Sequence, residues 1–378
     1  MYEQPLSTIS AHFANLEDPR TGPAVRHQLM DVLVIAICAV ICGADTWVEV
    51  EQFGHSRQQW LQEFLELPNG IPSHDTFGRI FALLDVEQFA HSFASWTHAI
   101  HTVTQGQVIA IDGKTVRRSH DNQLGKRAIH LVSAWATENQ ISLGQVQTEE
   151  KSNEITAIPE LLRLLDVSGC IVTIDAMGCQ REIAQQIVQQ QADYILAVKE
   201  NQSKLHERVQ QLFAYARGTK FQHVSHTYHA TYSKDHGREE KRQCWAIGVE
   251  EWLYCLDREE RWPHMQSVVM IHSERRVGGH LSLETRYYIT SLPPEAKRLL
   301  PAIRSHWQIE NSLHWVLDIA FREDESRLRK GHGQTNLSVL RKLALNLLKQ
   351  DTCAKGGIKA KRLRAGWDSQ YLLSLLNQ

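Results

Sequence analysis

The chain has 378 residues, 42% of them hydrophobic, and a formal net charge of −2, which allows two or three domains with a substantial core. Its seven cysteines form no C-x-x-C pair, which argues against a zinc or dithiol redox protein and fits a reducing compartment. No basic and apolar leader is visible, and the most apolar run, residues 32–44, is too short to span a bilayer. We therefore expect a cytoplasmic protein without membrane contact.

Charge is distributed unevenly along the chain. Residues 1–100 hold 4 Arg, no Lys and 12 acidic residues, whereas residues 322–364 hold 12 basic and 4 acidic residues. Such asymmetry points to a polyanion partner for the basic segment, and a solvated basic helix face is the alternative.

Residues 1–103 are predicted to form a helical N-terminal domain. D-V-L-V-I-A-I-C-A-V-I is apolar all round, W-V-E-V-E-Q-F is amphipathic, and Ser73 is a candidate N-cap for a third helix. The acidic composition argues against DNA contact over most of this surface, so packing or dimerisation stays open beside DNA binding.

Residues 104–217 are predicted to alternate strands and helices. V-I-A-I-D is a strand, T-E-N-Q turns a hairpin, and I-V-T-I-D and Y-I-L-A-V-K are later strands. Pro159 predicts that the helix before I-V-T-I-D begins near that proline, whereas Lys151, Asn153 and Glu154 are predicted to open it earlier, with Asn153 as a candidate N-cap. The order β-β-β-α-β-α-β is that of a ribonuclease H-like fold, in which the first and fourth strands are neighbours.

The C-terminal half is predicted in three parts. Residues 218–292 read as a β-rich insertion. Residues 293–350 complete the core with a long amphipathic helix over 302–321, and residues 351–378 form a C-terminal tail, the chain being basic and helical beyond 322. The predicted fold class is therefore α/β, a ribonuclease H-like catalytic core with a β-rich insertion and helical ends.

Asp112 and Asp175 each end an apolar, strand-like run. On neighbouring strands the two carboxylates would face each other, and a divalent cation such as Mg²⁺ would relieve their repulsion. Glu310 is the candidate third ligand because it lies among apolar residues in H-W-Q-I-E-N-S-L-H-W, where a glutamate needs a partner. His306, Glu310 and His314 are predicted on one helix face. Three such ligands suit two metal ions about 3.5–4 Å apart.

Other chemistries fit these residues less well. For Glu310 an ion pair with an arginine of the insertion remains an alternative, while an H-x3-E-x3-H zinc site lacks a partner motif. A phosphate-binding P-loop needs glycine at the position of Val108. A haloacid-dehalogenase-like phosphatase needs aspartate at the position of Lys114.

Six motifs together resemble the H-repeat-associated insertion-sequence transposases, bacterial DDE enzymes with a ribonuclease H-like core: I-A-I-D-G-K-T, E-K-S-N-E-I-T-A-I-P-E-L-L, T-I-D-A-M-G-C-Q, A-V-K-E-N-Q, H-G-R-E-E and H-W-Q-I-E-N-S-L-H-W-V-L-D. The resemblance covers essentially the whole chain. It implies that Asp112, Asp175 and Glu310 are the catalytic triad and the ligands of two Mg²⁺ ions, with Mn²⁺ able to substitute. It also implies double-stranded DNA partners, namely terminal inverted repeats and target DNA, and a homodimer or larger synaptic complex.

One departure from the wider DDE branch concerns its Y-x2-R-x3-E-x6-K pattern. Ile303, His306 and Leu317 occupy the Tyr, Arg and Lys positions here. The corresponding phosphate contacts must come from other residues, and we consider Arg304, His306 and His314 as substitutes.

Several further residues are candidates for DNA contact. Lys114 points to the same side of an extended chain as Asp112 and would neutralise a phosphate, unless it is a surface lysine. Lys199 and Asn201, at the same sheet edge as the acids, are predicted either to touch DNA or only to end the strand. Arg238 and Arg242 of the insertion would clamp a DNA backbone, unless they belong to a solvated hairpin. Salt-dependent phosphate contacts are predicted for the tail residues Arg327, Arg329, Lys330, Arg341 and Lys342.

The sequence thus predicts a transposase that cleaves DNA at element ends and transfers strands to a target. A DNA-binding relic without activity and a structure-specific nuclease on the same core are the alternatives.

Overall fold

A computed structural model describes residues 7–22, 25–100, 105–120, 127–148, 153–235, 237–257 and 262–377. The chain divides into two compact units. The first comprises residues 1–102, 113–153 and 309–378, and the second comprises residues 103–112 and 154–308. Strand β1 (Val108–Thr115) is shared, because one boundary falls between Asp112 and Gly113.

The helices and strands of the first unit, besides the end of β1, are α1 (Ser7–Phe13), α2 (Leu29–Ile41), α3 (Trp47–Ser56), α4 (Gln58–Leu61), α5 (His74–Leu83), α6 (Val86–Ile100), the 3-10 turn η1 (Arg117–Ser119), β2 (His130–Ala136), β3 (Ile141–Gln147), the π-helical η3 (Ile309–His314), α12 (Trp315–Phe321), the 3-10 turn η4 (Glu323–Glu325), α13 (Gly333–Gln350), α14 (Ile358–Trp367) and α15 (Ser369–Leu376). Those of the second unit are α7 (Glu154–Leu164), β4 (Ile171–Ile174), α8 (Arg181–Gln189), β5 (Asp193–Val198), the 3-10 turn η2 (Glu200–Gln202), α9 (Ser203–Gly218), β6 (His226–Asp235), β7 (Arg238–Gly248), α10 (Leu253–Leu256), β8 (Ser267–Val277), β9 (His280–Thr290) and α11 (Ala296–Ser305).

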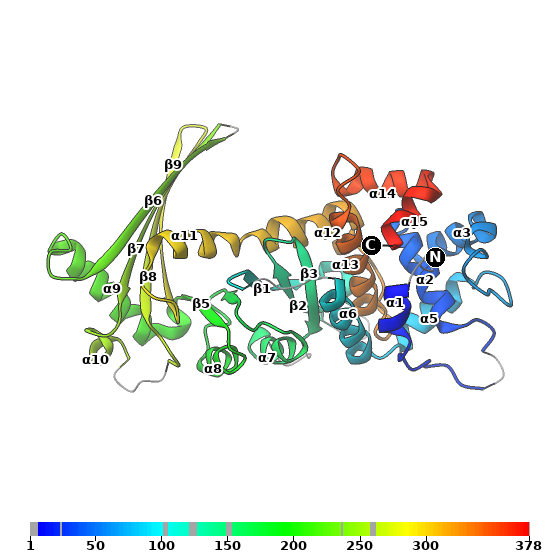
Figure 1. The fold of residues 1–378 in the computed structure, drawn as a ribbon, viewed down its shortest axis with the longest axis horizontal. Coiled ribbons are helices and arrows are strands. Elements are labelled where there is room, and N and C mark those ends of the chain that lie inside the picture. The colour runs from blue at the N-terminus through cyan, green and yellow to red at the C-terminus, as the bar shows by residue number, and fades with distance from the viewer. Residues whose placement is uncertain are drawn as a thin grey trace. The chain divides into compact units, whose positions relative to one another are not determined.

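Helices α2 and α13 form the centre of the first unit. Every residue of α2 from Asp31 to Ile41 is buried, as its all-round apolar sequence predicts, and α2 packs against α13 (Figure 1). Helix α13 also contacts α5 and α6. Ser73 caps α5 as predicted, since its hydroxyl accepts the Thr76 N–H. No helix in the described ranges is long and apolar enough to cross a membrane.

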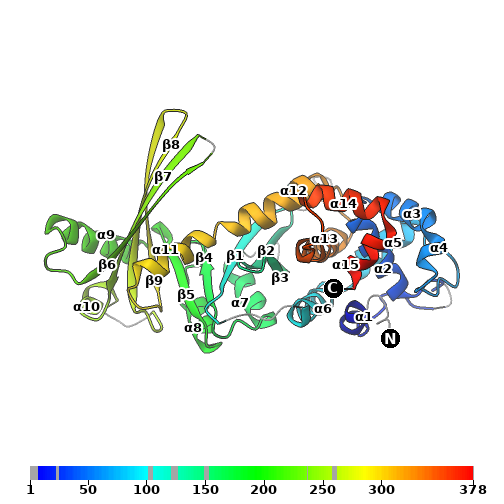
Figure 2. The same cartoon turned by 45° about the horizontal axis from the view of Figure 1, so that its top comes forward.

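The strand order confirms the predicted ribonuclease H-like fold. In the second unit the strands are ordered β1-β4-β5-β9-β8-β7-β6, and in the first unit β3 and β2 precede the end of β1. Strands β1, β4 and β5 are parallel, and the hairpin of β2 and β3 is antiparallel. Helices α7 and α8 lie on one side of the parallel strands (Figure 2). The first and fourth strands are therefore neighbours, as predicted.

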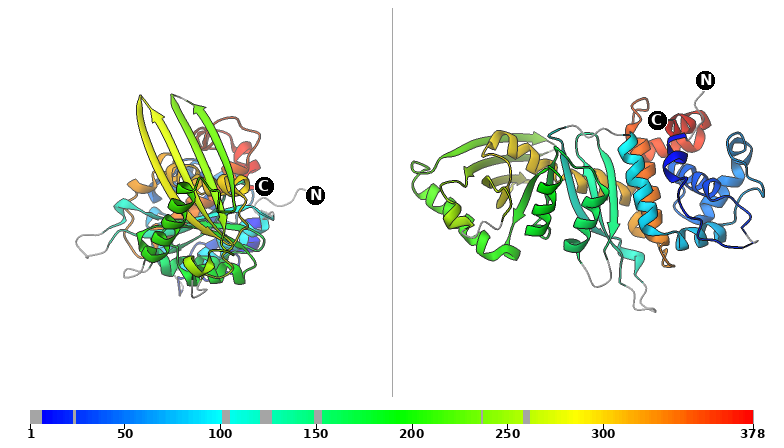
Figure 3. Two further views of the ribbon diagram at one scale, coloured as in Figure 1. Left: turned by 90° about the vertical axis from the view of Figure 1, so that its left-hand side faces the viewer. Right: turned by 60° about the horizontal axis from the view of Figure 1, so that its bottom comes forward.

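The β-rich stretch between α9 and α11 continues this sheet. Strand β9 pairs with β5, and β8, β7 and β6 follow as long antiparallel strands. Their base is buried under α11, whereas their tips extend away from the helices of the unit (Figure 3) and are exposed. The prediction of strands in this segment is correct.

Two predictions of helix limits are wrong. Helix α7 begins at Glu154 rather than near Pro159, because burial of Ala157, Ile158 and Leu161 compensates for the one hydrogen bond that proline cannot donate. The expected long helix over 302–321 is interrupted. Helix α11 ends at Ser305, a turn follows, and residues 309–314 wind as a π-helix before α12.

Gly331, just before α13, lies in tight contact with the end of α5. Its φ is +51°, and a Cβ atom there would lie 2.2 Å from the Ala82 carbonyl oxygen, which already accepts the His332 N–H at 3.0 Å. We expect Gly331→Ala to lower the free energy of unfolding by roughly 3 kcal/mol through strain and backbone displacement. Urea denaturation followed by circular dichroism measures this. In the matched control Gly357→Ala, the added methyl group meets nothing within 4 Å. Equal stability of the two variants would contradict the prediction.

Candidate catalytic site

Two aspartates occupy matching positions next to the paired residues of β1 and β4. Strands β1 and β4 pair in parallel, with Ile111 opposite Ile174. Asp112 and Asp175 follow these paired residues directly: Asp112 lies within β1, which continues to Thr115, and Asp175 comes just after the end of β4. The preceding residues 108–111 and 171–174 are fully buried, which fixes the register of both strands.

The loop after β4 holds the Asp175 carboxylate in place. Its Oδ1 accepts the backbone N–H groups of Met177 at 3.0 Å and Gly178 at 3.4 Å. A Cβ atom on Gly178 would lie 2.3 Å from the Ile174 side chain, so the tight turn requires glycine. The D-A-M-G sequence therefore serves to orient the carboxylate.

Charge around Asp175 favours a cation. Burial, and next the negative charge of Glu154, raise the pKa of Asp175, while the two backbone N–H groups and Lys199 act in the opposite direction. Glu154 is itself buried, with 8% exposure, at the start of α7. Asp175 and Glu154 repel each other in their ionised forms, and a divalent cation that takes oxygen ligands, such as Mg²⁺, would relieve this repulsion.

Glu154 was not identified as a site residue from the sequence. A glutamate in the first turn of a helix is adequately explained by the helix dipole. Only the folded chain shows that its charge acts on Asp175. The accompanying Asn153 is exposed, and Lys151 of the same motif lies outside the described residues.

Glu310 is exposed, whereas His314 is 4% exposed, and the segment that carries both winds as a π-helix. The negative charge of Glu310 acts on His314. Burial, and then the charges of Lys342 and Lys114, lower the pKa of His314 to about 4. A buried, neutral imidazole offers no charge to a phosphate, which disfavours DNA contact by His314.

A side-chain contact of His306 lies within the second unit. Its Nδ1 lies 3.1 Å from the Thr173 hydroxyl, which joins the end of α11 to β4. Asp112 and Asp175 thus belong to the second unit and Glu310 to the first. Among the described residues, no group of three or more His, Cys, Asp or Glu side chains is placed to hold a metal ion.

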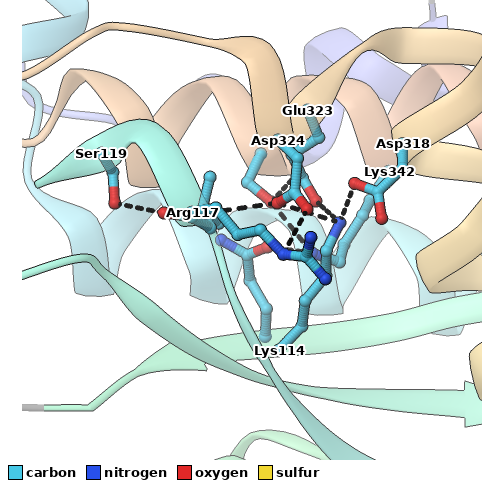
Figure 4. A network of polar contacts seen from close by, with 10 residues as sticks. Lys114, Arg117, Ser119, Asp318, Glu323, Asp324 and Lys342 are labelled. Atoms are coloured by element: carbon cyan, nitrogen blue, oxygen red, sulfur yellow. Dashed lines mark hydrogen bonds and ion pairs between the residues drawn. The ribbon is translucent and has the colours of Figure 1, made fainter.

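Lys114 lies in a buried ionic network of the first unit (Figure 4). Its ammonium group contacts the Asp318 carboxylate and lies 3.0 Å from Glu323 Oε2 and 3.9 Å from Asp324. The Arg117 backbone N–H also donates to Asp324, at 3.2 Å. The side chain of Lys114 is only 11% exposed. The predicted phosphate contact would therefore have to compete with several carboxylates.

Helix α13 adds the side chains of Ser338 and Lys342 to this network. Ser338 donates to Glu323 Oε1 at 2.8 Å, and the Lys342 ammonium donates to Ser338 at 3.0 Å and to Gln145 Oε1 at 2.5 Å. Burial raises the pKa of Glu323, but the nearby cations outweigh it and hold the pKa at about 2. Burial lowers the pKa of Lys342 to about 8, against the opposing charge of Glu323.

The predicted DNA-contacting residues fall into three groups. Lys199 is exposed, and Asn201 donates to the Ala176 carbonyl, so both lie beside the Asp175 loop. Arg238 and Arg242 both pair with Glu240. Arg327, Arg329 and Lys330 are exposed between η4 and α13.

For Arg341 and Lys342 the prediction of phosphate contact is wrong. Both are 1% exposed within α13. Their charges compensate Glu323 inside the protein instead of facing solvent.

The fold is a ribonuclease H-like sheet in which one aspartate directly follows the paired residues of β1 and another those of β4. The chain belongs to the DDE transposase family: the model described as "Transposase DDE domain" matches residues 104–347, and "DDE_Tnp_1-associated" matches residues 10–97. Members are phosphoryl-transfer enzymes that act on DNA. The family predicted from the motifs is thereby confirmed.

Full-length relatives carry the same family names. The chain is 42% identical to "Putative transposase YncI" of Escherichia coli O157:H7, over 98% of this chain and 95% of the relative. It is 38% identical to "H repeat-associated putative transposase YhhI" of Escherichia coli (strain K12), over 98% of both chains. A cryo-EM structure of the piggyBac transposase synaptic complex with hairpin DNA aligns with a TM-score of 0.44 and 11% identity, over 100% of this chain and 79% of that chain, a likeness too slight to bear on function.

The Glu323 charge is expected to stabilise the first unit only while it is ionised. Its folded-state pKa of about 2 lies below the ordinary value of 4.5, so the contribution is complete above pH 4.5 and is lost as the pH falls toward 2. Glu323→Gln should cost about 3 kcal/mol of unfolding free energy at pH 7, because it leaves buried cations uncompensated. Urea denaturation of both proteins at pH 7, 5 and 3 should show the difference shrinking at the lowest pH. Glu325→Gln, at an exposed glutamate of the same turn, should change stability far less. A difference that is constant with pH would contradict the assignment.

Proposed function

We propose that this protein is an active DDE transposase of an insertion sequence, with Asp112, Asp175 and Glu310 as its catalytic carboxylates. The observation that carries the proposal is the pairing of Ile111 with Ile174, which sets Asp112 and Asp175 at equivalent positions on adjacent parallel strands. Family membership supports the reaction class. The triad draws on both units, so the proposal requires Glu310 to reach the two aspartates in the active complex.

The three carboxylates would hold two Mg²⁺ ions, or Mn²⁺ in their place. When bound, the metal supplies Lewis-acid activation of the attacking oxygen and charge stabilisation of the leaving oxygen. The backbone N–H groups of Met177 and Gly178 keep the Asp175 carboxylate oriented for this task. Lys199 and the buried Glu154 set the local charge balance.

The proposed reaction has two in-line displacements at phosphorus. Water attacks the phosphodiester at the element end, the P–O3′ bond breaks, and the 3′ oxygen takes up a proton. The released 3′-OH then attacks a target phosphodiester, which forms a new P–O3′ bond and expels the target's own 3′ oxygen. No covalent protein–DNA intermediate is involved. Two element ends must react together, so we propose a homodimer or larger assembly on DNA, acting in the cytoplasm.

Replacing any member of the triad should abolish DNA cleavage. We expect Asp112→Ala, Asp175→Ala and Glu310→Ala each to lower the cleavage rate by at least about 10³-fold, since residues that act as a unit fail together. The assay uses labelled DNA carrying the repeats that flank the gene, with Mg²⁺ or Mn²⁺, and scores cleavage and strand joining. Chelation by EDTA should have the same effect as the substitutions.

Glu160→Ala is the matched control, because Glu160 is an exposed carboxylate of α7. It should cleave as the unaltered protein does. DNA binding without cleavage or joining by the unaltered protein would favour an inactive relic. Cleavage without joining would favour a structure-specific nuclease.

Arg327, Arg329 and Lys330 are the proposed phosphate contacts of the basic segment. Their joint replacement by alanine should weaken DNA binding and reduce the slope of log K against log salt by about 0.9 for each phosphate that the variant no longer neutralises. Fluorescence anisotropy with a DNA duplex over a salt series measures both quantities. Arg238→Ala is the comparison, since Arg238 already pairs with Glu240 at 2.7 Å and should alter the slope less. An unchanged slope in the triple variant would remove this segment from the interface.

A further inference from the structure

The motif lysine at position 114 is committed to contacts inside the protein. Lys114 lies two residues after Asp112 on β1, and its ammonium group contacts Asp318 and Glu323. Asp318 belongs to α12, which follows directly on the π-helix that carries Glu310. One side chain therefore joins the strand that bears the first aspartate to the segment that bears the glutamate. All of these contacts lie within the first unit.

The acceptors of Lys114 are themselves fixed. The Glu323 side chain is 1% exposed, and its second oxygen accepts a hydrogen bond from the Ser338 hydroxyl at 2.8 Å, which connects it to α13. Helix α13 is buried along most of its length and packs against α2, α5 and α6. Lys114 is thus paired with a buried carboxylate that is itself bonded to α13, so the ion pair links β1 to the helical core of the unit.

A second contact reinforces the same connection. Just after β1, the Arg117 backbone N–H donates to Asp324 at 3.2 Å, and the Arg117 guanidinium lies 3.4 Å from the same carboxylate. The turn η1 is thereby joined to η4, next to Glu323. The chain that leaves Asp112 is thus held at two successive points by residues 318–324.

We propose that Lys114 is a positioning residue for transposition: its ion pairs with Asp318 and Glu323 hold the end of β1 beyond Asp112 in a fixed relation to the segment that carries Glu310. It acts on the catalytic carboxylates and not on DNA. This inference rests on the proposed function, because the contact matters for catalysis only if Asp112 and Glu310 take part in one reaction. The lysine of the G-K-T sequence after Asp112 is then explained by its ion pairs inside the protein.

Lys114→Met tests the inference, with Lys349→Met as the matched control. Lys349 is also a partly buried lysine of the first unit, but within the described residues it contacts Gln140 and the Trp135 ring and no carboxylate. Lys114→Met should lower the cleavage rate constant at saturating DNA and metal by about 10²-fold, the scale expected when reacting groups are misplaced by about an ångström. Its DNA affinity should change by less than about twofold, because phosphate contacts elsewhere carry binding.

The apparent Mn²⁺ half-saturation for cleavage should rise several-fold in Lys114→Met and stay unchanged in Lys349→Met. Lys114→Arg, which retains the charge, should recover most of the loss. Both methionine variants are compared below their melting temperatures, so that a loss of stability alone does not enter. An unaltered rate constant in folded Lys114→Met would overturn the proposal. So would a tenfold loss of DNA affinity with an unchanged rate constant, which would make Lys114 a phosphate contact.

Hydrogen exchange separates this inference from the proposed function. Amides of residues 113–115 and 316–321 should exchange faster in Lys114→Met and not in Lys349→Met, whether or not the protein is active. If the unaltered protein fails to cleave DNA with either metal, the proposed function fails, and the catalytic meaning of the contact fails with it. Unchanged exchange in Lys114→Met, in a protein that does cleave, refutes the positioning role alone.

Discussion

The parallel pairing of β1 with β4 is the constraint on which the candidate site depends. Each strand contributes a short run of buried, mostly aliphatic residues and then one aspartate. A shift of register by one residue would exchange the faces to which the buried side chains point and would move the two carboxylates apart along the strands. The same burial that stabilises the sheet therefore sets the relation between Asp112 and Asp175, and no separate device is needed to align them.

Helix α13 shows how the first unit accommodates charge in its interior. Sixteen consecutive residues, Gly333–Leu348, are buried, including Arg341 and Lys342. Isolated charges would be very costly there, but Ser338 and Gln145 accept hydrogen bonds from the Lys342 ammonium group, and Glu323 supplies an opposing charge to both cations. Truncating one member of such a network leaves the others uncompensated. The network therefore stabilises one arrangement of β3, η4 and α13 over others.

Local sequence patterns predicted those elements of the fold that depend on residues close together in the chain. The apolar runs of β1 and β4, the all-round apolar α2 and the Ser73 cap each follow from residues close in the chain, and the strand order then identified the sheet topology. Net charge was misleading for Arg341 and Lys342, because their partner Glu323 lies in another element and only tertiary packing brings them together. The π-helical winding at Glu310 has no comparable local signal. The helix over 302–321 was predicted from an amphipathic pattern that does not distinguish the two windings.

Lys114 illustrates why a motif and a role are different inferences. The sequence places it near Asp112 and on the same side of the strand, which is equally compatible with a phosphate contact and with an internal ion pair. The contacts with Asp318 and Glu323 favour the ion pair, since a phosphate would have to displace two carboxylates from a side chain that is 11% exposed. A phosphate contact requires an accessible ammonium group, whereas the attraction within an internal ion pair is stronger where burial removes the competing solvent. The burial of Lys114 is thus the physical reason to connect it with the alignment of the carboxylates and not with the substrate.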